Sequence, residues 1–95
     1  MQNEFIIIND YCKHSNIEPD FILMLNEDGL IDIKMVDEVN CFPASQLNEI
    51  ERYAHLYYDL SINIAGIDAI RHLLKRMEDM QLRIKKLENE LKFYR

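Results

Sequence analysis

The chain has 95 residues, a formal net charge of −6 at pH 7 and 48% hydrophobic residues. A chain of this length forms one small domain with a marginal core, so a second subunit would add stability. Its two cysteines form no CxxC pair and no signal-type apolar run opens the chain, which favours a reduced, cytoplasmic setting. The longest apolar runs, 5–8 and 21–25, are far shorter than the ~20 residues that cross a bilayer, so we expect no membrane span.

Charge is distributed unevenly along the chain. Residues 1–62 hold 12 Asp/Glu against three Lys/Arg, a net charge of −9, whereas residues 63–95 hold five acids against eight Lys/Arg, a net charge of +3. An acidic head of this kind repels phosphate groups and attracts cationic protein surfaces. The simpler explanation is a charged surface that only keeps the protein in solution, and composition alone favours it.

The first predicted elements are a strand and a short helix. Residues 5–8 are uniformly apolar and predict a short buried strand. Asn9 or Asp10 can then cap a helix through residues 11–14, which Ser15-Asn16 ends.

A second short helix follows directly. Pro19 stands between two acids, which is typical of the first position of a helix, and we expect this helix to run to about Asn26 and to stop at Asp28-Gly29. Two short helices joined by a tight turn have the spacing of a helix-turn-helix, whose second helix normally enters a DNA groove.

The middle of the chain predicts a hairpin and a further helix. Apolar and polar residues alternate over 31–35, and residues 39–42 can return beside them across Asp37-Glu38 as a small wing. A helix should begin at residues 43–45 and end near Leu60. Its inward face carries apolar residues at helical spacing, namely Leu47, Ile50, Ala54 and Tyr57.

The start of the last helix is readable from local signals. Asn63 can cap the first turn, Ile62 can reach Ile67 as a hydrophobic staple, and the helix should begin near Ile64. Gly66 is costly inside a helix, so its place in the first turn suggests a closely approaching backbone, which we attribute to tight helix packing.

The tail carries a heptad seam. Apolar residues recur there at alternating spacings of four and three and define one face of a helix. We predict that this seam forms a homodimer through Leu73, Met77, Met80, Ile84, Leu87, Leu91 and Tyr94. The alternative is a single helix that folds back onto its own head. The charged residues that flank the seam could form opposite-charge pairs between two antiparallel tails. These residues are Arg76, Arg83, Glu88 and Glu90.

Chemical motifs are absent from the sequence. The three histidines lack the paired spacing of a zinc site, the cysteines have no local ligand partners, and neither a Gly-rich phosphate loop nor a GxSxG motif occurs. We therefore expect no enzyme activity and no catalytic, cofactor-binding or metal-binding residues. The basic residues of the tail interleave with acids, so a solvated face is favoured over a nucleic-acid patch.

The order of elements resembles the MerR-type winged helix-turn-helix. The predicted fold is mainly α: a MerR-like head over residues 1–62 with a small β-hairpin wing, and a long C-terminal helix over 63–95 within the same domain. In MerR-type DNA binders the second helix looks like Arg-Thr-Leu-Arg-Tyr-Tyr-Glu-Arg, whereas here Asp20, Leu23 and Glu27 stand at the three Arg positions. Because phosphate contacts and counterion release require cations, this exchange argues against DNA binding.

A closer resemblance is to CbpM-type chaperone modulators. It rests on Asp-Leu-Ser-Ile-Asn-Ile-Ala-Gly-Ile at 59–67, Leu73-Leu74 before the heptads, Phe42 at the end of the wing, and Glu-Asp-Gly-Leu at 27–30. The resemblance implies a MerR-like fold, a dimer, and binding to the J domain of a CbpA- or DnaJ-type co-chaperone of the Hsp70 system, which it inhibits or tunes without any enzymatic step. The alternative function is a MerR-like transcriptional regulator with an atypical, non-basic DNA-reading helix.

The partner-binding surface is predicted on the second helix. Five successive apolar residues, 21–25, cannot all face one core from one helix, so some should be exposed beside the acids. The predicted surface consists of Asp20, Phe21, Leu23, Met24, Glu27 and Asp28. The alternative places Phe21, Ile22 and Leu25 in the core with the acids solvated around it.

Overall fold

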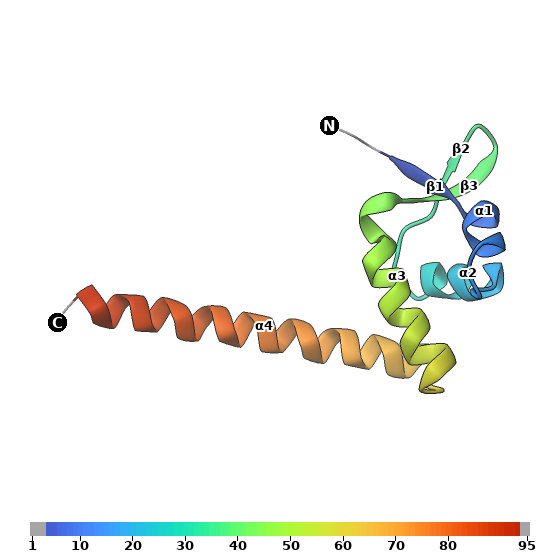
Figure 1. Ribbon diagram of the computed structural model, residues 1–95. Helices are drawn as coiled ribbons and strands as arrows, with labels where there is room; N and C mark the ends of the chain where they lie inside the picture. Colours follow the sequence, from blue (N-terminus) through green and yellow to red (C-terminus); the bar gives the residue numbers. More distant parts are fainter. Residues whose placement is uncertain (1–3, 94–95) are drawn as a thin grey trace.

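The computed structural model describes residues 4–93. In chain order the elements are β1 (Phe5–Ile7), α1 (Ile8–Lys13), α2 (Pro19–Glu27), β2 (Lys34–Val36), β3 (Val39–Pro43), the 3₁₀ turn η1 (Ala44–Gln46), α3 (Leu47–Ala54), the π-helical turn η2 (His55–Asp59) and α4 (Ile64–Phe93). The fold is mainly α, with a winged helix-turn-helix head and a long C-terminal helix that projects from it (Figure 1), which confirms the predicted fold class.

The wing belongs to a three-stranded antiparallel sheet in the order β1-β3-β2. The hairpin was predicted, but β2 begins at Lys34 and not at Ile31. Ile31 is buried in the core, and the next two backbone amides donate to side chains instead of a strand: Asp32 to Gln46 Oε1 (2.9 Å) and Ile33 to Asn26 Oδ1 (3.2 Å). The pairing of β1 with β3 joins segments about 35 residues apart, and no local pattern predicts it.

The first helix begins earlier than expected. The sequence predicts Ile8 as the end of the strand, but α1 starts there, and the extended Ile7 precedes it without a side-chain cap. Asn9 and Asp10 therefore lie in the first turn of α1 and do not cap it. Ile8 is buried, so its helical position directs the side chain into the core.

The core connects the head to the start of α4. Six large side chains are essentially inaccessible to solvent: Phe21, Ile22, Leu25, Phe42, Ile50 and Ile67. They come from α2, β3, α3 and the first turn of α4. Tyr11 of α1 packs edge-on against Phe42, with ring centroids 5.5 Å apart. Since Ile67 is part of this cluster, the first turn of α4 is anchored to the head.

The turn before α4 follows the predicted cap. Asn63 Oδ1 accepts a hydrogen bond from the Gly66 amide at 2.8 Å, which confirms Asn63 as the capping residue. Gly66, however, is not required by another helix. A Cβ atom there would lie 2.8 Å from Cγ2 of Ile62 and 3.3 Å from Asn63 Oδ1, so the residues that precede the helix fill this space.

Helix α4 determines the shape of the molecule. Its 30 residues span about 45 Å at 1.5 Å per residue. The radius of gyration of 17.5 Å exceeds the ~12 Å of a compact chain of this length, and the extents are 59 × 36 × 21 Å. None of the helices within residues 4–93 is both long and apolar enough to cross a membrane.

Candidate functional site

Helix α2 begins with proline and is held by a distant tyrosine. Glu18 is extended at the N-cap and provides no side-chain cap, while Pro19 occupies the first turn, where its missing N–H is tolerated. The Glu18 amide donates instead to the Tyr58 hydroxyl at 3.1 Å. The Phe21 ring lies 4.7 Å from that of Tyr57 and 5.3 Å from that of Tyr58. Turn η2 therefore positions the start of α2, a role that sequence reasoning missed.

The end of α2 is a Schellman-type stop. The Gly29 amide donates to the Asn26 carbonyl (3.0 Å) and the Leu30 amide to the Leu25 carbonyl (2.9 Å). Gly29 has φ +77°, a conformation that glycine adopts without steric cost. The helix is therefore delimited as predicted, and Leu30 returns into the core.

Helix α2 separates its apolar residues between two faces. Phe21 (1% exposed), Ile22 and Leu25 are buried, whereas Leu23 is 40% exposed and Met24 is half-buried against the core. Phe21 must therefore be removed from the predicted partner surface, because its ring is enclosed by the core and by η2. The other five predicted residues lie together on or beside the outer side of this helix: Asp20, Leu23, Met24, Glu27 and Asp28.

The electrostatics of this outer face are negative. Asp20 in the first turn is favourable to the helix dipole, but Glu27 and Asp28 stand at the carbonyl end, where a carboxylate costs about 0.3–1 kcal/mol. No Lys or Arg occurs between Pro19 and Ile33. Helix stability therefore does not account for the acids at the C-terminal end. This α2 surface combines carboxylates with exposed Leu23 and suits a partner that is cationic and apolar.

The tip of the wing has the same sign of charge. Asp37 and Glu38 form the two-residue turn between β2 and β3, with φ values of +53° and +64°. Both the wing tip and α2 therefore carry carboxylates. The head contains only three cationic residues to oppose them, Lys13, Lys34 and Arg52.

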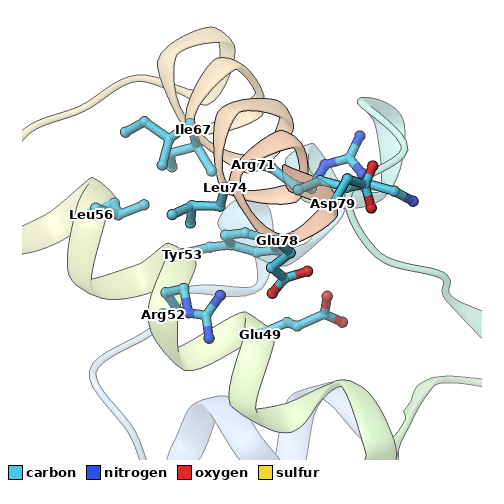
Figure 2. A pocket seen from close by; sticks show the side chains of 11 residues that line it. Glu49, Arg52, Tyr53, Leu56, Ile67, Arg71, Leu74, Glu78 and Asp79 are labelled. Atoms are coloured by element: carbon cyan, nitrogen blue, oxygen red, sulfur yellow. The ribbon is translucent and has the colours of Figure 1, made fainter. Parts of the chain in front are cut away.

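A cleft between α3 and α4 was not predicted. It has a volume of about 270 Å³. Its floor is apolar and is formed by Tyr53, Leu56, Ile67, Ile70 and Leu74. Figure 2 shows Leu56, Ile67 and Leu74 between the two helices, with charged residues of both signs around them.

The charges around the cleft balance one another. Three acids and three cations line it, Glu49, Glu78, Asp79, Arg52, Arg71 and Lys75. Arg71 donates to Asp68 at 3.1 Å. Burial raises the pKa of Tyr53, Glu49 raises it further, and the two arginines oppose this shift. The cleft therefore combines an apolar floor with a rim in which three positive and three negative side chains balance.

The seam of α4 is uncovered in the structure. Its described members, Leu73 to Leu91, are 55–66% exposed. Figure 1 shows α4 extending away from the head, so the alternative in which the tail folds back onto its own head is not what the structure shows. Tyr94, the last predicted seam residue, lies outside the described residues. Leu82 is also 66% exposed but lies off the seam.

The histidines and cysteines are dispersed. Within residues 4–93, no three His, Cys, Asp or Glu side chains come close enough to hold a metal ion. His55 Nδ1 lies 2.8 Å from Asp59 Oδ2, and His14 Nδ1 lies 2.9 Å from the Asp10 carbonyl. Both contacts are local and solvent-exposed. Cys12 is half-buried, Cys41 is buried, and both are free thiols.

Fold and surface together define a winged helix-turn-helix protein whose second helix is acidic. A model of the MerR HTH family of regulatory proteins matches residues 6–89, so the chain belongs to this family. Neither the curated proteins nor the solved structures compared with the chain gave a match.

Proposed function

We propose that this chain is a CbpM-type modulator that binds the J domain of a CbpA- or DnaJ-type co-chaperone and inhibits or tunes it. One observation carries the proposal: helix α2, which would read DNA in a MerR-type regulator, presents Asp20, Glu27 and Asp28 around Leu23 and carries no cation. CbpM-type modulators are members of the same family.

Charge argues for a protein partner over DNA. Most protein–DNA affinity comes from cations that neutralise phosphates and release counterions. Here both the second helix and the wing tip, Asp37-Glu38, carry carboxylates, which repel phosphates. Each such group adds repulsion that the three cations of the head do not offset. A J domain, which the resemblance describes as a small helical hairpin with a basic face, offers the complementary charge.

We further propose that two copies pair through the seam of α4 as a homodimer. The seam exposes six large apolar side chains along one face, a surface that costs free energy in water unless a second helix covers it. A dimer would present two acidic heads at the ends of one paired tail. This arrangement also fits the division of the chain into a head, 1–62, and a dimerisation helix, 63–95.

A second candidate function is transcriptional regulation by DNA binding. The family match favours it, because the family is described as regulatory helix-turn-helix proteins. In that case Lys13 at the end of α1, Lys34 in the wing and Arg52 would have to supply the phosphate contacts. Such binding would be weak and strongly salt-dependent.

Parallel binding measurements separate the two functions. The purified chain is titrated against an isolated J domain of a DnaJ-type co-chaperone and against a labelled random DNA duplex, each at low and at high salt. We expect saturable binding to the J domain that weakens with salt, and no binding to the duplex. Retention of the duplex without J-domain binding would establish the second candidate and overturn the proposal.

Charge reversal locates the surface. Asp20→Lys with Glu27→Lys should weaken J-domain binding at least tenfold, because two attractive contacts become repulsive. Glu78→Lys with Asp79→Lys makes the same change in net charge on α4, off the seam, and should have little effect. Equal losses in both double variants would show that only net charge matters and that α2 is not the binding surface.

A further inference from the structure

The sheet has a second apolar face that lies outside the core. Directly paired residues of antiparallel strands point to the same side of a sheet. The register pairs Ile6 with Phe42, and both belong to the core side. The opposite side, here called the outer sheet face, therefore carries Phe5, Ile7, Val36, Val39, Cys41 and Pro43, together with Lys34.

Four apolar side chains of the outer sheet face are open to solvent in part. Phe5, Ile7, Val36 and Val39 are each 37–39% exposed, and none of them belongs to the buried core cluster. Cys41, at the centre of this face, is 4% exposed and also lies outside that cluster. The solvent side of an antiparallel sheet is normally polar. An apolar solvent side therefore suggests a binding surface.

The charges beside this face are carboxylates. Val36 and Val39 close the hairpin through Asp37 and Glu38, both in the left-handed conformation. Asn-Gly is the sequence that such a turn favours, because glycine adopts positive φ without strain. The glutamate is thus a poor choice for the turn itself. Glu38 places a second carboxylate next to the paired Val36 and Val39. The one cation of the outer sheet face, Lys34, lies at the other end of β2.

We infer that the outer sheet face is a second docking surface, distinct from α2, for a cationic amphipathic helix of a partner protein. Such a helix would lay its apolar side on the two valines and Ile7 and direct lysine or arginine side chains to Asp37 and Glu38. The carboxylates of Asp37 and Glu38 argue against DNA, an anionic membrane or a second copy of the head as the binding partner. They repel phosphates of DNA and anionic lipids, and a second copy of the head would bring the same charges against them.

Methyl NMR of the full-length chain tests this inference independently of any J domain. The probe is a synthetic helical peptide of leucine and lysine with its leucines along one side, and the matched control is the leucine and glutamate version. We expect the lysine peptide, and not the glutamate peptide, to shift the methyl signals of Ile7, Val36 and Val39. Shifts confined to Leu23 and Met24 on α2, or to the α4 seam, would overturn the inference.

Substitutions on the two sides of one hairpin make the test specific. Val36→Thr with Val39→Thr keeps β-branched side chains but replaces one methyl group of each valine with a hydroxyl, and should weaken peptide binding by about tenfold. Met35→Thr lies on the opposite side of the same hairpin and should leave binding unchanged. Equal effects of the two changes, or a DNA duplex that produces the same shifts, would contradict a peptide-specific outer face.

The turn offers a second test with two opposite readouts. Asp37→Asn with Glu38→Gly should raise the melting temperature, because the new pair suits the turn, and should also weaken peptide binding several-fold at low salt by removing both charges. Melting and binding that both improve would show that the carboxylates have no part in docking. Failure of the J-domain measurements would leave this result unaffected, since the peptide is a separate probe.

Discussion

The hydroxyl of Tyr58 accepts a hydrogen bond from the backbone amide of Glu18 at 3.1 Å, across 40 residues of chain. The Tyr58 ring also packs against Phe21, the first buried residue of α2. This single side chain thus connects the end of the α3 segment to the start of the helix that carries the proposed α2 surface. The orientation of the α2 surface therefore depends on Tyr58, a residue outside α2.

Tyr58→Phe tests this connection. It retains the ring contact with Phe21 but removes the acceptor, which should lower the free energy of unfolding by about 1 kcal/mol. Urea unfolding followed by circular dichroism measures this loss. Tyr58→Ala should cost clearly more, because the aromatic contacts disappear as well. A phenylalanine variant as stable as the wild type would show that the Glu18 amide is equally well satisfied by water.

Gly66 and Ile62 should show coupled effects on stability. Glycine to alanine in a helix normally stabilises by about 1 kcal/mol. Here the added Cβ would lie 2.8 Å from Ile62 Cγ2, a β-branched methyl group that cannot swing away freely, so Gly66→Ala should destabilise the protein. In an Ile62→Ala background the same change should stabilise it. A double-mutant cycle from thermal melts measures this change of sign. Additive effects would contradict the crowding.

The seam of α4 should determine the oligomeric state. Ile84→Lys places a charge in the middle of the proposed dimer seam and should shift the protein to a monomer at micromolar concentration, as measured by sedimentation equilibrium. Leu82→Lys is the matched control, because Leu82 is as exposed as any seam residue but points off the seam. If both variants remain dimeric, or both dissociate, the seam is not the determinant of pairing.

Stability should fall at alkaline pH because of two tyrosines. Burial raises the pKa of Tyr53 and of Tyr11 above the usual 10.0, with Glu49 and Glu51, respectively, adding to the shift. The folded state then keeps protons that the unfolded state has lost. The contribution of these two tyrosines to the free energy of unfolding is fully present below pH 10. It is lost as the pH rises through their raised pKa values in the folded state.

The measurement is urea unfolding between pH 9 and pH 11.5. A Cys12→Ser background is used, because burial also raises the pKa of this thiol from 9.0. Tyr11→Phe with Tyr53→Phe should flatten the alkaline decline. An undiminished decline in this variant would assign it to other groups.

Several features followed from local pattern. The helix-turn-helix spacing, the proline start and glycine stop of α2, the Asn63 cap and the hairpin across Asp37-Glu38 all depend on residues within a few positions of one another. Such signals remain readable without the fold because their partners are adjacent in the chain. The start of β2 could not be predicted in this way, because the two backbone amides before it, of Asp32 and Ile33, donate to the side chains of Gln46 and Asn26.

The sequence by itself determined the sign of charge on α2 and on the wing tip, because ionisable residues keep their charge wherever the chain places them. The tertiary structure alone decided that Phe21 is enclosed while Leu23 is exposed, that β1 pairs with β3, and that the outer sheet face remains apolar toward solvent. Those outcomes depend on contacts between segments tens of residues apart. Which apolar side chain is buried is set by the surfaces that meet in the folded molecule, and periodicity in one segment does not specify its distant neighbours.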